Sequence, residues 1–221
     1  MGKFTLYLEQ YALISLEKRM KLTTMIGEHT SELDLDSGTI IFNNGLAFPF
    51  QVLGTESDNT LSWLWGWAEE QTEIPGDLLA SSLLLKDWGK REGIEEFITP
   101  SVDINKADGH AFSLISTEII HASCYYRSPY EGGAVFILLF GRDIDRQPLF
   151  DLDGLTREFL DLTLQYELNH RSALVSYLRG NKLSFTEKGP FVSGKLATGE
   201  TLTAEFDEMG HLKTMDGKTV S

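Results

Sequence analysis

The sequence is poor in cysteine and has no long apolar run. Its single cysteine, Cys124 among 221 residues, excludes an intramolecular disulfide and any zinc or iron–sulfur site built from several cysteines. The longest uncharged apolar stretch, residues 132–141, is about half as long as the roughly 20 residues of a membrane-spanning helix. The first residues lack the continuous apolar core and the small-residue cleavage site of a secretory signal. We therefore expect a cytoplasmic protein that has no membrane partner.

Positive charge is also scarce. The chain has 19 basic and 33 acidic residues, a net charge of −14, which argues against binding to nucleic acid phosphates or to anionic lipids. The acidic excess is concentrated in residues 31–100, which contain thirteen acidic and three basic residues. Its acidic side chains include Glu32, Asp34, Asp36, Glu56, Asp58, Glu69, Glu70, Glu73 and Asp77. They form either a solvated, solubilising surface or an acidic face that attracts a basic protein partner.

Recognisable catalytic motifs are absent as well. No phosphate-binding loop, dinucleotide fingerprint or nucleophile elbow occurs. The carboxylates of residues 143–153 alternate as in a calcium-binding loop, but Pro148 and Gly154 stand where that loop needs glycine and glutamate. Turn and capping roles account for these carboxylates. The sequence thus gives no metal site and no cofactor, and it favours a protein that is not an enzyme.

Residues 4–26 show the periodicity of a helix. Apolar side chains from Phe4 to Ile26 fall on one stripe at about 100° per residue, and Gly27 is a natural stop. A second apolar line, on the other side, contains Leu6, Leu13, Leu16 and Met20. A helix that is apolar on two sides is either sandwiched within the fold or shared with a second copy, so one prediction is a homo-oligomer through this helix.

The rest of the chain separates into strand-rich and helix-rich stretches. Residues 31–68 have the pattern of antiparallel strands, and residues 134–140 that of a strand buried on both faces. Helical patterns follow at about 78–93, 107–126, 153–166 and 171–179. The last forty residues have the pattern of a hairpin or a three-stranded meander.

These patterns predict an α+β fold. An antiparallel sheet from residues 31–68 and 134–140, with residues 182–215 as a further candidate, packs against helices that include residues 4–26. The predicted domains are a core of residues 1–180 and a C-terminal hairpin or meander of residues 181–221 packed on that core.

Trp63, Trp65 and Trp67 are the densest aromatic feature of the chain. On a strand, the period of two places all three on one face, and each ring offers about 150–250 Å² of surface. They either anchor the sheet in the core or form a stacking platform for a sugar or a base. The acidic residues of the neighbouring segment 69–73 argue against a nucleic acid, and we favour the core.

The predicted helix 107–126 gathers groups capable of chemistry. His110, Thr117, His121 and Cys124 fall within about 60° of one another on a helical wheel. Histidines on one face suit general acid–base chemistry or metal binding, but these two lie about 16 Å apart along the axis, too far to share a metal ion. Cys124 beside His121 resembles a nucleophile beside a base. We favour a solvated polar face for the histidines and a packing role for the cysteine.

Tyr125, Tyr126 and Arg127 follow at the expected end of this helix. Two aromatic rings and one guanidinium, in a chain short of positive charge, are typical of a rim that recognises an anion. The alternative is that Arg127 pairs with one of the many carboxylates. His110, His121, these three residues and the three tryptophans are therefore the candidate binding residues, and no catalytic residue is assigned.

Two segments of the chain resemble an uncharacterised bacterial family. Residues 46–68 read LAFPFQVLGTESDNTLSWLWGWA, and residues 125–129 read YYRSP ahead of the strand 134–140. The family pairs a V-L-G-x-x-S segment with a W-x-W-x-W-type strand, followed by helices and a Y-R-x-P-like segment. The resemblance covers about residues 30–140, and the tryptophan repeat is its most specific element. It implies a stand-alone, cytoplasmic bacterial protein and brings no activity with it.

Two functions are compatible with the sequence. The first is a non-catalytic cytoplasmic binding protein with an acidic face, similar to an inhibitor or an immunity protein and directed at a basic partner. It follows from the localised acidity, the two-sided first helix and the missing catalytic motifs. The second is a small hydrolase or small-ligand-binding domain whose pocket uses His110 or His121 with Tyr126 and Arg127. We favour the first.

Overall fold

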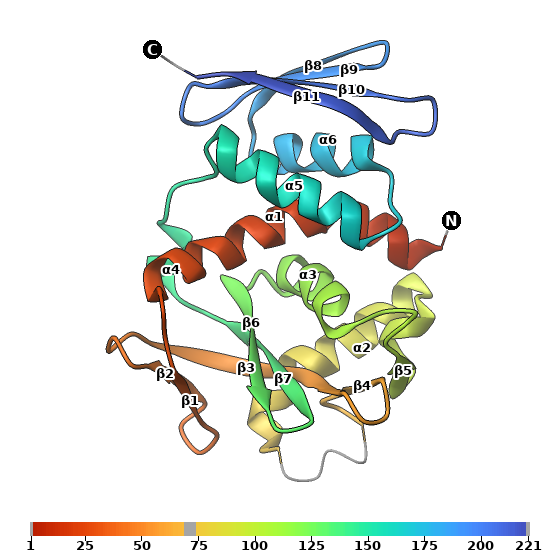
Figure 1. Cartoon of the computed structure of the whole chain (residues 1–221). Coiled ribbons are helices and arrows are strands. Elements are labelled where there is room, and N and C mark those ends of the chain that lie inside the picture. Colours follow the sequence, from red (N-terminus) through yellow and green to blue (C-terminus); the bar gives the residue numbers. More distant parts are fainter. Residues whose placement is uncertain (1, 69–73, 220–221) are drawn as a thin grey trace. The chain divides into compact units, whose positions relative to one another are not determined.

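The computed structural model describes residues 2–68 and 74–219 (Figure 1). The described helices are α1 (Lys3–Ile26), η1 (Gly76–Leu79), α2 (Ala80–Glu92), η2 (Glu95–Phe97), α3 (Gly109–Ile120), α4 (Arg142–Asp145), α5 (Leu152–Gln165) and α6 (His170–Gly180). The described strands are β1 (Ser31–Asp34), β2 (Thr39–Phe42), β3 (Ala47–Ser57), β4 (Ser62–Trp65), β5 (Ser101–Asp103), β6 (Cys124–Tyr130), β7 (Gly133–Leu139), β8 (Ser184–Lys188), β9 (Phe191–Lys195), β10 (Thr201–Phe206) and β11 (Leu212–Lys218).

These strands form two antiparallel sheets. In the seven-stranded sheet the order is β1-β2-β3-β4-β5, and β7 pairs with β3 on one edge and with β6 on the other. The C-terminal sheet has four strands in the order β11-β10-β9-β8. The predicted α+β fold with a C-terminal meander is confirmed, and the meander contains one strand more than the three expected at most.

Contacts between residues divide the chain into two compact units. Unit 1 contains residues 1–17 and 147–221, and unit 2 contains residues 18–146. The C-terminal sheet therefore shares a unit with α5, α6 and the first part of α1, whereas the prediction joined residues 1–180 into one domain. The helix α1 is continuous from Lys3 to Ile26, so both units contain part of it.

In unit 2, turn chemistry sets the first strands. Gly38 and Gly45 have φ angles of +63° and +85° in the turns Asp36-Ser37-Gly38 and Asn43-Asn44-Gly45, a conformation that glycine adopts without steric cost. The turn at Gly38 pairs Asp34 with Thr39, and the second turn leads into the eleven-residue β3. β3 then pairs with β2, β4 and β7, which makes it the central strand of this sheet.

A mainly aliphatic cluster forms part of the core of unit 2. Its buried members are Leu22, Ile26, Ile40, Phe42, Phe48, Phe50, Val52, Leu78, Cys124, Ile137, Leu139 and Ile144. The packing role predicted for Cys124 is thereby confirmed. Trp63 and Trp65 lie instead in an aromatic group that includes Phe97 and Phe112.

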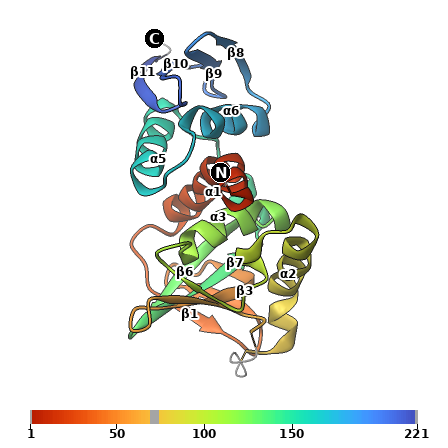
Figure 2. The same ribbon diagram turned by 90° about the vertical axis from the view of Figure 1, so that its right-hand side faces the viewer.

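Unit 1 packs helices against the four-stranded sheet. Figure 2 shows α6 beneath this sheet, and a Cβ atom added at Gly194 would lie 3.1 Å from Leu178 of α6. Asp151 and Asn169 cap α5 and α6 by accepting hydrogen bonds from the backbone N–H groups of Gly154 and Ser172.

A buried carboxylate joins three parts of unit 1. Glu17 is 2% exposed, and its Oε1 accepts hydrogen bonds from the Phe150 N–H at 2.5 Å and from the Tyr177 hydroxyl at 2.8 Å. Its Oε2 accepts from Asn181 Nδ2 at 3.2 Å. Burial and the neighbouring Glu17 raise the pKa of Tyr177, so its hydroxyl stays a donor. These bonds hold the segments around residues 150 and 177–181 to α1.

The helix predicted for residues 107–126 ends six residues early, and a strand takes its place. His121 adopts the left-handed conformation with φ +57°. Its N–H reaches the Glu118 carbonyl at 3.3 Å, and the Ala122 N–H reaches the Thr117 carbonyl at 2.9 Å. These two bonds are a Schellman motif, which closes α3 although no glycine marks the stop. Residues 124–130 therefore form β6, which corrects the helical assignment of 124–126.

Candidate functional site

Two of the three tryptophans that were candidate binding residues lie in the interior. Trp63 and Trp65 are fully buried, and their ring centroids lie 5.2 and 4.9 Å from that of Phe112 in α3. The indole of Trp65 donates to the Glu96 carbonyl at 2.9 Å. The interpretation of this strand as core is confirmed for both residues. A stacking platform on this face of the strand has no room for a ligand.

Trp67 differs because β4 ends at Trp65. Its ring stacks on Trp65 with centroids 6.3 Å apart, and it is half-buried. The Lys86 ammonium lies 3.8 Å from the centre of its ring, a cation–π contact between α2 and the segment that follows β4. The third tryptophan therefore holds α2 in place. The acidic residues 69, 70 and 73, which argued against a nucleic acid, lie outside the described residues.

The polar side chains of the predicted helix 107–126 are not gathered on one solvated face. Thr117 is fully buried and donates to the Ser113 carbonyl, while His121 is exposed in the turn after α3. Cys124 is buried in β6, where burial raises the pKa of its thiol and keeps it protonated. A neutral buried thiol is a poor nucleophile, so the pairing of Cys124 with His121 is not a catalytic one.

The strand β6 sends Tyr125 and Tyr126 to opposite faces of the sheet. The Tyr126 hydroxyl lies 3.0 Å from His29 Nε2 and 3.1 Å from Ser31 Oγ. Its ring meets Phe42 edge-on with centroids 5.4 Å apart. Tyr126 therefore belongs with the aliphatic cluster and does not share a site with Tyr125.

Tyr125 lies beside His110 and Arg19. His110 Nδ1 is 3.1 Å from the Tyr125 hydroxyl, and the Arg19 guanidinium carbon is 5.8 Å from the centre of the tyrosine ring. Tyr125 is 1% exposed, while His110, Arg19 and Arg127 are half-buried. Arg127 is two residues beyond Tyr125 on β6 and so lies on the same face. We call Arg19, His110, Tyr125 and Arg127 the Arg19 cluster.

Within the Arg19 cluster, the two arginines influence the pKa values of His110 and Tyr125. The pKa of His110 is lowered to about 4, chiefly by burial; Asp108 opposes this shift, and the guanidiniums of Arg19 and Arg127 contribute to it. Burial raises the pKa of Tyr125 to about 12, and Arg19 offsets part of that rise. At neutral pH the imidazole and the phenol are uncharged, so the positive charge of the cluster resides on the two arginines.

The Arg19 cluster contains three of the eight predicted binding residues and one that was not predicted. His110, Tyr125 and Arg127 lie together, whereas His121 and Tyr126 do not join them. Trp63 and Trp65 belong to the core, and Trp67 contacts Lys86 of α2. Arg19 was missed because it lies 91 positions before His110 in the sequence, on a different element. The only indication in the sequence that Arg19 is partly buried was its position beside the apolar stripe of the first helix.

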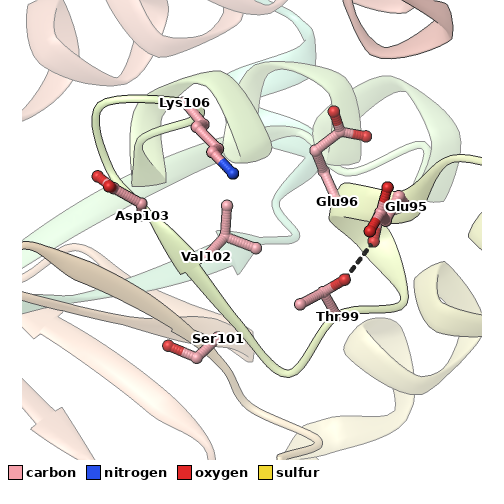
Figure 3. Close-up of a pocket in the computed structure, with 7 residues that line it drawn as sticks. All are labelled: Glu95, Glu96, Thr99, Ser101, Val102, Asp103 and Lys106. Carbon is pink, nitrogen blue, oxygen red and sulfur yellow. Dashed lines mark hydrogen bonds between the residues drawn. The ribbon is translucent and has the colours of Figure 1, made fainter.

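A small pocket of about 170 Å³ lies elsewhere in unit 2, between η2, β5 and the turn after it. Figure 3 shows Lys106 directed over Val102, with Glu96 and Asp103 on either side. Hydrogen bonds from the Asn105 N–H and side-chain amide lower the pKa of Asp103, so its carboxylate is charged at neutral pH. Glu95 also lines the pocket. The pocket is predominantly acidic and suits a basic group.

Unit 1 has a larger groove, of about 670 Å³, that sequence reasoning missed. Residues 163–170, Met209 and His211 line it. His170 Nδ1 accepts from the Leu212 N–H at 3.0 Å, and its ring lies 5.3 Å from that of His211. Burial, together with His211, lowers the pKa of His170. No predicted site residue lines this groove.

Two structural searches of the described residues bear on function. No group of three or more histidine, cysteine, aspartate or glutamate side chains in residues 2–68 and 74–219 has the arrangement to hold a metal ion. Over the same residues, no helix combines the length and the apolar character needed to cross a membrane.

Comparison with known proteins gives a family and no activity. A model described as "Family of unknown function (DUF6882)" matches residues 6–142. No curated protein and no solved structure matches the chain. The match includes residues 46–68 and 125–129, which carried the resemblance, and it begins earlier than the expected residue 30. Because it spans more than half of the sequence, the chain belongs to this family of unknown function.

Proposed function

We propose that the protein is a non-catalytic binding protein of the bacterial cytoplasm that recognises a basic protein through acidic side chains of unit 2. This unit contains 20 acidic and 10 basic residues, whereas unit 1 contains 13 and 9. A surface dominated by one charge steers an oppositely charged partner and disfavours others. In this property the protein resembles inhibitors and immunity proteins.

One observation carries the proposal: exposed carboxylates without ion-pair partners lie on two segments that contact each other. The turn between β1 and β2 contacts η1, since a Cβ atom at Gly38 would lie 2.8 Å from Leu78. Asp36 and Asp77 are exposed on these two segments, and Glu32 is exposed on β1. None of the three forms an ion pair within the part of the chain that the structure describes. We call Glu32, Asp36 and Asp77 the acidic patch.

The acidic pocket beside η2 adds a second attachment point for a basic partner. Its Glu95 is exposed and its Glu96 half-buried, and both line the pocket together with Lys106. A lysine or arginine side chain of a partner is matched to these carboxylates in charge and hydrogen bonding. The non-catalytic part of the proposal is supported by the inert thiol of Cys124 and by the separation of His121 and Tyr126 from Tyr125.

The experiment compares capture of partners by two matched triple variants. In the first, Glu32→Gln, Asp36→Asn and Asp77→Asn neutralise the acidic patch. In the control, Asp161→Asn, Glu167→Gln and Glu208→Gln remove the same charge from exposed positions of unit 1. The tagged chains are incubated with a bacterial cytoplasmic extract, and bound proteins are identified by mass spectrometry.

We expect the wild type and the control to retain basic proteins that are released as salt screens the charges, at ionic strengths of about 0.5 M and above. The acidic-patch variant is expected to lose them. The proposal is wrong if the retained proteins are not basic, or if both triple variants retain them equally.

A second prediction, a hydrolase or ligand-binding domain built on His110 or His121 with Tyr126 and Arg127, has no comparable support. His121 and Tyr126 lie away from the other two residues. The homo-oligomer through α1 also stays a prediction, although Leu13 and Leu16 of its second apolar line are already buried in the single chain. Light scattering at micromolar concentration tests it directly.

A further inference from the structure

The Arg19 cluster presents a charge that the protein does not balance. Three other cations of unit 2 form ion pairs: Lys18 pairs with Glu118 at 2.6 Å, Lys90 with Asp87 at 3.1 Å and Arg146 with Asp143 at 3.7 Å. Neither Arg19 nor Arg127 is in an ion pair within the described residues. Two half-buried arginines without a carboxylate partner are unexpected in a unit that contains twice as many acidic as basic side chains.

Arg19 also has a donor that is buried without an acceptor. Its Nε lies below the surface, and no hydrogen-bond partner for it exists among the described residues. A guanidinium has five N–H donors and no acceptor, so its needs are met only by oxygen atoms. A buried donor without a partner is uncommon in folded proteins and points to a missing water, ion or ligand.

The carboxylate of Asp108, which acts on both His110 and Tyr125, also caps α3. Asp108 Oδ1 accepts the Ala111 N–H at 2.7 Å and caps α3. The Gly109 N–H at the same helix end donates to Glu56 Oε2 at 2.8 Å. Asp108 and Glu56 therefore bind backbone N–H groups at the start of α3, and no described residue supplies an acceptor for Arg19 Nε.

We propose that Arg19, His110, Tyr125 and Arg127 bind a small oxyanion, namely the carboxylate or phosphate group of a ligand. Guanidinium groups match both kinds of oxyanion in geometry and charge. The Tyr125 hydroxyl and the neutral His110 imidazole hydrogen-bond to each other, which uses one of their two protons, and the other proton is one further donor on the same side of β6. The proposal concerns a different surface from the acidic patch and stands independently of the partner protein.

Anion binding at this position couples to His110. The groups that act on its imidazole are Asp108 at the start of its helix, Arg19 of α1 and Tyr125 and Arg127 of β6. A bound anion offsets the two guanidiniums, so the imidazole accepts a proton more readily with the anion present. By linkage, this proton uptake strengthens anion binding as the pH falls below neutrality, over the range in which the anion itself stays ionised.

The experiment follows His110 by NMR in the full chain while inorganic phosphate or acetate is added. Sodium chloride at the same ionic strength is the reference. We expect saturable shifts of the His110 signals and a higher His110 pKa with phosphate, with acetate or with both. A response to acetate identifies a carboxylate as sufficient, and a response to phosphate alone identifies the phosphate group as the ligand chemistry.

Variants assign the response to the Arg19 cluster. Arg19→Gln and Arg127→Gln each remove one guanidinium and are expected to weaken binding at least tenfold. Arg142→Gln removes an exposed guanidinium of unit 2 and is expected to leave the affinity unchanged.

Three results would overturn the proposal: no saturable response to either anion, an equal response to chloride, or an equal loss in all three variants. If Arg19→Gln fails to fold, Arg127→Gln and the wild-type titration of His110 still decide the matter.

Discussion

Tyr125 and Tyr126 are neighbours in the chain, yet their surroundings differ. The hydroxyl of Tyr126 lies within hydrogen-bonding distance of both His29 and Ser31 on one face of β6. On the other face, Tyr125 contacts His110 and lies beside an arginine whose Nε has no acceptor. On the Tyr126 face, the polar groups form a closed hydrogen-bond network at the edge of the core. On the Tyr125 face, at least one N–H donor, Arg19 Nε, has no acceptor among the described residues.

The comparison shows where to look for function in a chain without catalytic motifs. Residue type alone does not separate the two tyrosines, because both are aromatic, partly polar and next to a histidine. What separates them is whether the neighbouring donors are satisfied within the protein. Buried polar groups left unsatisfied cost stability, so their presence calls for an explanation outside the fold.

The largest expected effect comes from removing the two rings. Tyr125→Ala should lower the free energy of unfolding by about 4 kcal/mol, because a fully buried ring leaves a cavity. Tyr126→Ala, at a half-buried position, should cost about 2 kcal/mol. Urea denaturation measures both. Equal losses would contradict the assignment of the two residues to a buried and a half-buried environment.

Acid should destabilise the protein through His110. Its pKa is about 4 in the folded chain and about 6.5 in the unfolded one, so the unfolded state binds more protons between these values. The associated stability is complete above pH 6.5 and is lost as the pH falls toward 4, a change of about 2 to 3 kcal/mol. Denaturation measured across this range should show a smaller loss for His110→Gln than for the wild type. His121→Gln is the control and should keep the full loss.

The closed network around Tyr126 should show a smaller effect. Tyr126→Phe removes the hydroxyl that His29 and Ser31 share and should cost about 1 kcal/mol. The loss of stability caused by Tyr126→Phe should be smaller in a Ser31→Ala background, because that background already lacks one hydrogen bond of the network. A double-mutant cycle measures this coupling. Strict additivity would mean that the hydroxyl does not join the two residues.

The smallest effect concerns the turn that sets the register of β6. His121 holds a positive φ that costs a residue with a side chain about 1 kcal/mol, so His121→Gly should stabilise the protein by about 0.5 to 1 kcal/mol. Thermal unfolding detects this as a rise in Tm. A loss of stability would show that the imidazole itself, and not the backbone, holds this turn.

Much of the fold follows from local sequence patterns. Period-two tryptophans, the Asp-Ser-Gly and Asn-Asn-Gly turns and the apolar run 134–140 gave the right strands, because local chemistry decides each of them. The end of α3 could not be predicted, since a histidine occupies the left-handed position that glycine usually marks. That error placed Tyr125 and Tyr126 on a helix, although Pro129 is compatible with an edge strand such as β6.

The candidate site was harder to predict than the fold. Arg19, His110 and Tyr125 come from three elements that only the folded chain brings together. His110 and Tyr125 were predicted from the chemistry of their side chains. That Arg19 Nε lacks an acceptor depends on how the interior packs. No sequence pattern within one segment predicts such an unsatisfied donor.

The helix α1 has a practical consequence for work on this family. The family match spans residues 6–142, but residues 6–17 of α1 belong to the unit that is completed by residues 147–221. A fragment cut to the match would strip Glu17 of Tyr177, Asn181 and the Phe150 amide, leaving a carboxylate and apolar side chains such as Leu13 and Leu16 to face water. Such a fragment should aggregate on expression, so the boundaries of the matched segment are poor guides for cloning.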